Sequence, residues 1–413
     1  MKSRNLIKPK VRTGPLRPSS IASAVALMFA VASAPVPATE LSNHQPLPLA
    51  VQQSSQVAST AIKRPKIQLA IILDTSNSMD GLIEQTRNQL WQLVNEFSTA
   101  RQNGVTPILE IALFEFGNSG ISRDRGYVRM LNGFTRELDA VSQGLFSLTT
   151  NGGDEYCGYA IETAVEQLQW SHSDSDIKTI FIAGNESFAQ GPVAYQHAIT
   201  LAARQGISIN TIHAGTHQEG IADGWQAGAM LAGGDYLSID ANQQVVHIEA
   251  PQDARINELN AKLNETYVPY GSQGADKAQR QLEQDQLSSD ISVGLLAKRA
   301  QSKASAFYGN ADWDLVDALK DGEMAEEQIA EMEEAALPEP MQGLSAQQKL
   351  DYLQQKQSER ESIREEIIEL SETRASYVAE KKLEQAAAAP SVSDALSGAI
   401  RKQAQQKNFS LAD

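Results

Sequence analysis

The stretch from residue 67 to residue 82, IQLAIILDTSNSMDGL, joins an apolar run to a set of polar residues. Five apolar residues, 69–73, lead directly into Asp74, and Ser76 and Ser78 follow at alternate positions. An unbroken apolar run of this length is typical of a strand that is buried on both faces of a sheet. The stretch therefore predicts a buried strand that presents one carboxylate and two hydroxyls at its carboxyl end.

Similar apolar runs recur through residues 67–250 and alternate with amphipathic helical patterns. The candidate strands are 67–74, 108–116, 127–131, 178–184, 207–213 and 236–240. This alternation predicts an α/β fold, a doubly wound and mostly parallel six-stranded sheet with helices on both faces. Ligands of such sheets bind at the carboxyl ends of the strands, which is where Asp74 is expected.

After about residue 250 the alternation gives way to helical patterns alone, so the chain divides into segments of different character. We predict a signal peptide over 1–38, a flexible linker over 39–66, the α/β domain over 67–250, a helical extension over 251–323, an acidic helix and a long helix over 324–389, and a C-terminal helix or tail over 390–413.

The long helix is expected to begin after a capping-box pattern, Ser345 to Gln348, and to cover 346–389 without Gly or Pro. One helix of this length would span roughly 65 Å. Its apolar seam is close to a seven-residue repeat, but Arg360 and Arg374 interrupt it. The region is therefore predicted to be partly coiled coil, with self-association through these helices. A helical hairpin and a long arm packed on the rest of the chain remain alternatives.

The first 38 residues follow the pattern of a bacterial secretory signal. Basic residues without an acid precede the apolar run IASAVALMFAVASA, and small residues lead to an expected cleavage after Ala38. The apolar run is shorter than the ~20 residues that a bilayer requires, so no stable membrane insertion is expected after cleavage. We predict an exported protein, periplasmic or extracellular.

Composition narrows the classes of partner and chemistry. The formal net charge of −16 argues against nucleic acid, because phosphate binding requires clustered Lys and Arg. Cys157 is the single cysteine, so no intramolecular disulfide is expected. The chain contains no GxSxG elbow, HExxH helix or phosphate loop, and we predict that it is not an enzyme.

The motif DTSNS, with Asp74, Ser76 and Ser78, resembles the DxSxS signature of the von Willebrand factor type A (VWA) family, which has the integrin-I-like fold. The resemblance covers roughly 67–250, and the whole chain resembles exported bacterial proteins that join such a domain to a helical tail. It implies a metal-ion-dependent adhesion site (MIDAS) for a divalent cation, Mg²⁺ or Ca²⁺, with one position open for a carboxylate of a partner protein. Hard cations of this kind take oxygen ligands.

Two further loops of the family's site differ here. In the second loop, NGGDEYCGYAIETAV, Asp154 or Glu155 stands where the family has threonine. In the third loop, FIAGNESFAQG, Gly184 and Asn185 stand where the family has aspartate, and Glu186 follows. The exchange of acids between the loops suggests a relocated site.

The hypothesis is a variant MIDAS with Asp74, Ser76, Ser78 and Asp154 as metal ligands and with Glu155 or Glu186 assisting. Its predicted function is metal-dependent protein–protein interaction. The alternative is that Asp74 and the serines only cap the following helix. The chain would then be a metal-independent structural or scaffolding protein that acts through its helical tail.

Three smaller patterns have an ordinary structural interpretation as well as a functional one. His213 and His217, with Glu219 nearby, have a spacing that holds zinc on a helix, but here they are expected at a strand end and a turn. Cys157 is a candidate reactive thiol or a small buried side chain. The aromatic residues Phe307, Tyr308 and Trp313 would either form an exposed docking patch or pack the tail against the domain.

Overall fold

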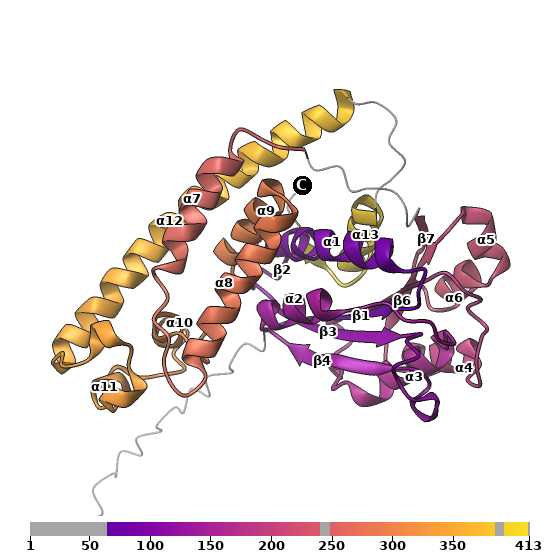
Figure 1. The fold of residues 1–413 in the computed structure, drawn as a ribbon, viewed down its shortest axis with the longest axis horizontal. Helices are drawn as coiled ribbons and strands as arrows, with labels where there is room; N and C mark the ends of the chain where they lie inside the picture. The colour runs from indigo at the N-terminus through magenta and orange to yellow at the C-terminus, as the bar shows by residue number, and fades with distance from the viewer. Residues whose placement is uncertain (1–63, 240–247, 385–391, 412–413) are drawn as a thin grey trace, which may run out of the picture. The chain divides into compact units, whose positions relative to one another are not determined.

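The computed structural model describes residues 64–239, 248–384 and 392–411. Its centre is a six-stranded sheet of order β4-β3-β1-β5-β6-β7 (Figure 1). The strands are β1 (Lys66–Asp74), β3 (Ile108–Phe116), β4 (Arg129–Thr135), β5 (Ile177–Gly184), β6 (Ser208–Ala214) and β7 (Tyr236–Ile239). Neighbouring strands are parallel except β3 and β4. The predicted mostly parallel sheet is confirmed, and the strand expected over 127–131 instead occupies Arg129–Thr135.

Helices cover both faces of the sheet. They are α1 (Asp80–Ser98), α2 (Leu138–Ser147), α3 (Cys157–Gln167), α4 (Tyr195–Arg204), α5 (His217–Ala222) and α6 (Trp225–Leu231), with the 3₁₀ turn η1 (Arg123–Arg125). Leu69, Ile71 and Leu73 of β1 belong to one core together with α1, whereas Ala70 and Ile72 belong to another together with α3 and α4. Because both faces of β1 are buried, the strand requires its continuous apolar run.

The strand order reverses direction between β1 and β5. The chain passes from β1 to β3 on one side, and from β5 to β6 on the other. The loops that leave the carboxyl ends of β1 and β5 therefore diverge to opposite faces, which opens a crevice where doubly wound sheets bind ligands. Asp74 ends β1, and Gly184 ends β5, at this crevice.

The helical extension consists of α7 (Asp253–Asn264), α8 (Gly274–Ile291), α9 (Val293–Ala304), α10 (Leu315–Lys320), α11 (Glu326–Ala330), the 3₁₀ turns η2 (Glu334–Ala336) and η3 (Glu339–Met341), and α12 (Ala346–Glu384). Within the described residues, α12 packs against α7, α9, α10 and α11. This arrangement corresponds to the predicted alternative of a long arm packed on the rest of the chain. The predicted Ser345–Gln348 capping contacts are present.

The charged residues that interrupt the seam of α12 have buried partners in the same chain. Arg360 donates to Asp314 over 2.6 Å and to Asp317 over 2.8 Å. Arg374 donates to Asp253 over 2.5 Å. These pairs explain why the apolar repeat is broken, because a buried cation must have a charged or hydrogen-bonding partner.

A second buried charge network joins the extension to the α/β part. Arg299 on α9 is fully buried and donates to Asp139 on α2 over 2.6 Å and to Asp285 on α8 over 2.5 Å. Its guanidinium lies 4.7 Å from the ring of Trp91 on α1. The predicted aromatic trio Phe307, Tyr308 and Trp313 is buried in the core instead of forming an exposed patch.

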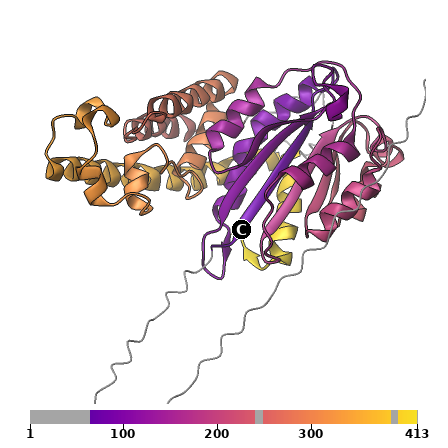
Figure 2. The same ribbon diagram turned by 90° about the horizontal axis from the view of Figure 1, so that it is seen from below.

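The C-terminal segment returns to the α/β part. Helix α13 (Val392–Gln406) buries Ala399, Ile400 and Ala404 and packs on α1. Figure 2 shows this segment as the yellow helix beside the strands. The short strand β8 (Phe409–Ser410) then pairs with β2 (Arg101–Gln102) in an antiparallel register. The sequence did not predict these two strands, because two residues are too few to produce a periodic pattern.

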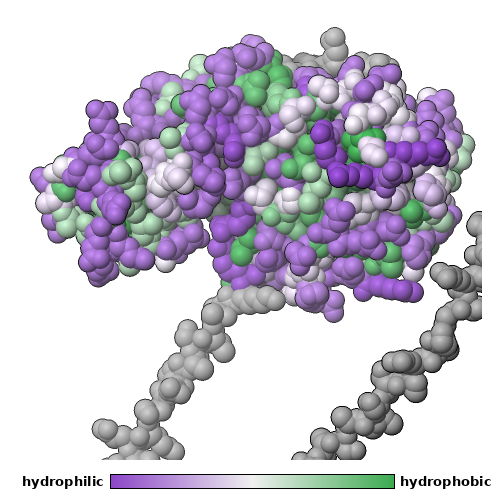
Figure 3. Space-filling view, turned by 60° about the horizontal axis from the view of Figure 1, so that its bottom comes forward, coloured by the Kyte–Doolittle hydropathy of each residue, from purple (hydrophilic) through white to green (hydrophobic). Residues whose placement is uncertain are grey.

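The predicted signal peptide over 1–38, linker residues 39–63 and the segment 385–391 lie outside the described residues. None of the helices in the described ranges combines the length and the apolar character needed to cross a membrane. Figure 3 shows hydrophilic side chains over most of the face that it draws, with hydrophobic residues in small scattered groups.

Candidate metal centre

The loop after β1 gathers the three residues of the DTSNS motif. Asp74 has no exposed surface, and the backbone N–H of Ser76 donates to its Oδ1 over 2.8 Å. The hydroxyl oxygens of Ser76 and Ser78 lie 3.4 Å apart. The N-cap residue of α1 is Met79, and no side chain caps this helix. Helix capping by Asp74, Ser76 or Ser78 is therefore not observed.

The second loop brings Glu155 against Asp74. Glu155 is 5% exposed, and its backbone N–H donates to the side-chain oxygen of Gln190. Gly117, just after β3, has a φ of +78°, and a Cβ at this position would lie 2.6 Å from Asp74 Oδ1 and 3.0 Å from Glu155 Cγ. Glycine is thus required both for the backbone conformation and for the space that the two carboxyl groups occupy.

The two carboxyl groups perturb each other. Burial raises the pKa of Asp74, although hydrogen bonds from Glu155 and from the backbone of Ser76 and Asn185 act to lower it. Burial and then the adjacent Asp74 raise the pKa of Glu155 to about 9, and the charge of Glu186 adds to the rise. At neutral pH and without a cation, Glu155 therefore keeps its proton.

The third loop contributes Asn185. This residue stands at the family's aspartate position, but it was not among the predicted metal ligands. Its side-chain N–H donates to Ser78 Oγ over 2.9 Å. Two ring nitrogens hold the loop: His213 Nε2 lies 3.2 Å from the Asn185 carbonyl oxygen, and Trp225 Nε1 donates to the Glu186 carbonyl over 2.8 Å. The signal that identifies Asn185 is its position at the end of β5, beside the end of β1.

The other predicted ligands lie at the margin of this cluster. Asp154 is exposed, and its Oδ2 accepts a hydrogen bond from the Tyr156 hydroxyl over 3.0 Å. Glu186 is exposed and acts on Glu155 through its charge. The structure therefore brings Asp74, the two serines and Glu155 together, with Asn185 as an additional member.

The donor atoms of this cluster fit a hard divalent cation. Three buried oxygens have no hydrogen-bond partner: Asp74 Oδ2, Glu155 Oε2 and Asn185 Oδ1. Unpartnered buried oxygens of this kind are explained by an ion or a water, and Mg²⁺ and Ca²⁺ prefer oxygen donors. Within the described ranges, no group of three or more His, Cys, Asp or Glu could hold a metal. A cation here would therefore rely on hydroxyl and amide oxygens in addition to the two carboxylates.

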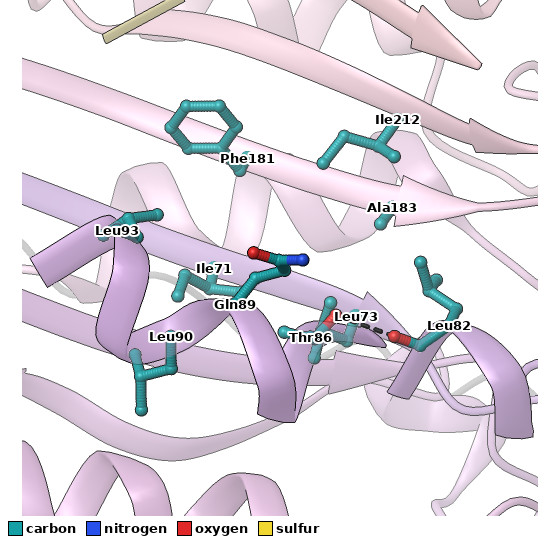
Figure 4. A pocket seen from close by; sticks show the side chains of 10 residues that line it. All are labelled: Ile71, Leu73, Leu82, Thr86, Gln89, Leu90, Leu93, Phe181, Ala183 and Ile212. Carbon is teal, nitrogen blue, oxygen red and sulfur yellow. Dashed lines mark hydrogen bonds between the residues drawn. The ribbon is translucent and has the colours of Figure 1, made fainter. Parts of the chain in front are cut away.

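A small apolar cavity lies beneath the centre, between α1 and the sheet. Its volume is about 40 Å³, and its lining includes Leu73, Leu82 and Ala183, each close in sequence to the loops of the centre (Figure 4). Figure 4 also shows the amide of Gln89 directed from α1 toward the strands, and its Oε1 has no partner. A cavity of this size has room for little more than a water molecule, so we interpret it as a packing gap.

The contacts of the histidine pair and of Cys157 indicate structural roles for these residues. His217 lies against the ring of Tyr236 at a centroid distance of 5.1 Å, and its Nδ1 is 3.5 Å from Ser238 Oγ. Neither His217 nor His213 belongs to a group of metal-binding side chains in the described ranges. Cys157 is 1% exposed in the core between the sheet and α3, and burial raises the pKa of its thiol well above the usual value, which disfavours a reactive thiolate.

Comparisons with known proteins found similar solved structures but no matching family model. No protein-family model matches the chain and no curated protein matches it. Proximal thread matrix protein 1 from the mussel byssus, solved with a zinc-occupied MIDAS motif, is 14% identical with a TM-score of 0.32 over 44% of this chain and 43% of that one. The SpRpn10 VWA domain is 16% identical with a TM-score of 0.31 over 44% of this chain and 91% of that one.

The pilus adhesin SpaC from Lactobacillus rhamnosus GG is 14% identical, with a TM-score of 0.32 over 51% of this chain and 32% of that one. The chain thus spans less than half the length of the mussel protein and about a third of the adhesin. The α/β part has the doubly wound, mostly parallel six-stranded sheet that the sequence predicted, with one antiparallel strand and helices on both faces.

Proposed function

We propose that the chain is an exported, metal-dependent protein-binding module whose variant MIDAS holds Mg²⁺ or Ca²⁺. One observation supports this most strongly: the buried carboxyl groups of Asp74 and Glu155 face each other with unpartnered oxygens, beside the hydroxyls of Ser76 and Ser78. Two acids in contact are unfavourable unless they share a proton or a cation. The position at the crevice between β1 and β5 is where this fold binds ligands.

Each residue has a distinct part in this proposal. Asp74 and, once deprotonated, Glu155 supply the negative charge that attracts the cation. Ser76 and Ser78 supply neutral hydroxyl oxygens, and Asn185 orients Ser78 through its hydrogen bond. The cation would supply an electrophilic position for a carboxylate of a protein partner. Ser78 and Glu186 are exposed, so the rim of the centre is accessible to such a side chain.

The proposed role is binding and not catalysis, and nucleic acid is not a proposed partner. The charge of the chain, −16, disfavours polyanions except where a cation intervenes. A protein that presents an acidic side chain to the cation is therefore the partner class that we propose. The alternative of a metal-independent scaffold assigns partner binding to the helical extension instead.

Partner capture distinguishes these two functions. The purified full chain is offered to exported proteins of its source organism in Mg²⁺ or Ca²⁺, and again in EDTA. We expect proteins that are retained with a cation, released by EDTA, and lost with Asp74→Asn as bait. Asp321→Asn, which removes an exposed carboxylate at the end of α10, serves as the matched control and retains them. Retention that is equal for Asp74→Asn and wild type would assign partner binding to the helices.

A further inference from the structure

A cleft lies at the edge of the sheet opposite to the metal centre. It has a volume of about 260 Å³ and lies among the amino ends of β5 and β6, the ends of α4 and α6, and the end of α13. Lys178 of β5 and Lys407, just after α13, both line it. Two cations from distant parts of an acidic chain thus meet at one cavity.

The two ammonium groups have hydrogen-bond donors to spare. Lys178 is 4% exposed, and its Nζ donates to the carbonyl oxygens of Ser171, over 3.0 Å, and Gln205. The Gln205 contact is the usual interaction of a lysine with a helix C-terminus. Lys407 Nζ donates to the Asp174 carbonyl over 2.8 Å. Each ammonium has three N–H donors, so one remains on Lys178 and two remain on Lys407 among the described contacts.

The two charges are also close enough to repel each other. Burial lowers the pKa of Lys178, and the charge of Lys407 lowers it as well, whereas Asp174 and Asp176 raise it. In the part of the chain that the structure describes, neither lysine forms an ion pair with a carboxylate, and both donate to carbonyl oxygens. Asp174 and Asp176 act against the repulsion between the two lysines, and a bound anion would add to their effect.

The walls of the cleft leave room for such an anion. Gly206 and Gly233 end α4 and α6 with φ values of +68° and +69°. A Cβ at Gly206 would lie 3.5 Å from Lys178 Nζ, and one at Gly233 would meet no atom within 4 Å. Gln403 on α13, which is 6% exposed, also lines the cleft. The helix ends alone would favour a cation, so the two lysines determine the sign of the ligand.

We propose that this cleft binds a small oxyanion, phosphate or a short dicarboxylate, which bridges Lys178 of the sheet and Lys407 of the C-terminal segment. The spare N–H donors of the two ammonium groups would form charge-assisted hydrogen bonds to its oxygens. Because the anion would connect β5 to the segment after α13, its binding should hold residues 399–411 more firmly against the sheet.

Calorimetric titration of the full chain with sodium phosphate and, separately, sodium succinate tests this proposal. The titrations are done in EDTA at constant ionic strength, so that they are independent of the metal centre. We expect saturable binding of at least one anion, and slower amide exchange over 399–411 when it is bound. Lys407→Gln should weaken binding by about tenfold or more, since it removes one of the two ammonium groups.

Lys402→Gln is the matched control, because Lys402 lies on α13 shortly before Lys407, pairs with Asp235 and does not line the cleft. It should bind the anion as wild type does. Lys178→Met is a second test, and its titration is interpreted only if its circular dichroism spectrum matches that of wild type. The absence of saturable binding for both anions, or equal losses in Lys407→Gln and Lys402→Gln, would overturn the proposal. Preference for phosphate or for succinate would identify the chemical source of the oxyanion.

Discussion

Glu155 and Asp154 are neighbours in the chain, yet the structure gives them different surroundings. Glu155 is buried against Asp74, whereas Asp154 is exposed and bonded to Tyr156. The sequence predicted that the second loop gains a carboxylate, because both residues stand where the family has threonine. It named Asp154 as the ligand and Glu155 as an assisting residue, whereas Glu155 is the one that lies against Asp74. Which of the two lies there depends on the backbone contact with Gln190 and on the space beside Gly117, neither of which produces a pattern in the sequence.

The pH dependence of stability follows from the raised pKa of Glu155. In the metal-free folded chain Glu155 titrates near 9, against a usual value of 4.5. Between these two pKa values, Glu155 is protonated in the folded state and ionised in the unfolded state. The free energy of unfolding therefore falls as pH rises through this window. We expect a slope approaching about 1.4 kcal/mol per pH unit in urea titrations in EDTA.

Glu155→Gln should remove most of this slope, since an amide has no proton to lose. Asp321→Asn should leave it unchanged, because this exposed residue lies in the helical extension. A stability profile of Glu155→Gln that still falls steeply between pH 5 and about 9 would show that another group carries the proton.

Asn185 provides a test of the third loop. Replacing it with alanine removes the donor to Ser78 and a buried oxygen beside the centre. Loss of such a supporting contact typically weakens a metal site by about 10- to 100-fold, and we expect this range for Mg²⁺ or Ca²⁺ measured by calorimetry. Asn95→Ala, which removes a similar amide on α1 that bonds to α9, is the control. Equal affinity in Asn185→Ala and wild type would exclude Asn185 from the centre.

At the scale of elements, Gly117 and Gly104 form a matched pair. Both have a φ of +78°, but a Cβ at Gly104 meets no atom within 4 Å, whereas one at Gly117 would collide with Asp74. Each alanine variant should lose about 1 kcal/mol of stability from backbone strain. Gly117→Ala should lose more than Gly104→Ala and should also lose metal affinity, because the carboxyl group must move. Chemical unfolding and calorimetry measure both effects, and equal behaviour of the two variants would contradict this account.

The sequence predicted the large elements better than the small ones. The apolar runs of β1, β3 and β5 are long enough to identify buried strands, and the strand over 108–116 was predicted with its observed bounds. The pairing of β2 with β8 was not predictable, since it joins two-residue strands about 300 residues apart. The charged seam of α12 suggested a weak coiled coil, and the pairs of Arg360 and Arg374 supply the physical reason.

At the scale of the whole molecule, Arg299 connects the helical extension to the α/β part. Removing its side chain would leave the buried carboxylates of Asp139 and Asp285 without the guanidinium that pairs with both of them. Arg299→Ala should cost about 3–5 kcal/mol of unfolding free energy in urea, since a broken buried pair leaves an uncompensated charge. Arg255→Ala, whose pairs with Glu258 and Glu366 are exposed, should cost much less, because solvent screens exposed ion pairs. Similar costs for both variants would mean that the Arg299 network does not hold the two parts together.

Calorimetric titration of Mg²⁺, Ca²⁺ and Mn²⁺ into the metal-stripped chain at neutral pH tests the metal centre at the end of β1 directly. We expect one cation to bind per chain and Glu155 to release a proton, so that the measured heat depends on the ionisation enthalpy of the buffer. Asp74→Asn should abolish this binding, and Asp321→Asn should preserve it. No binding in wild type, or the same binding in Asp74→Asn, would contradict a metal centre at the end of β1.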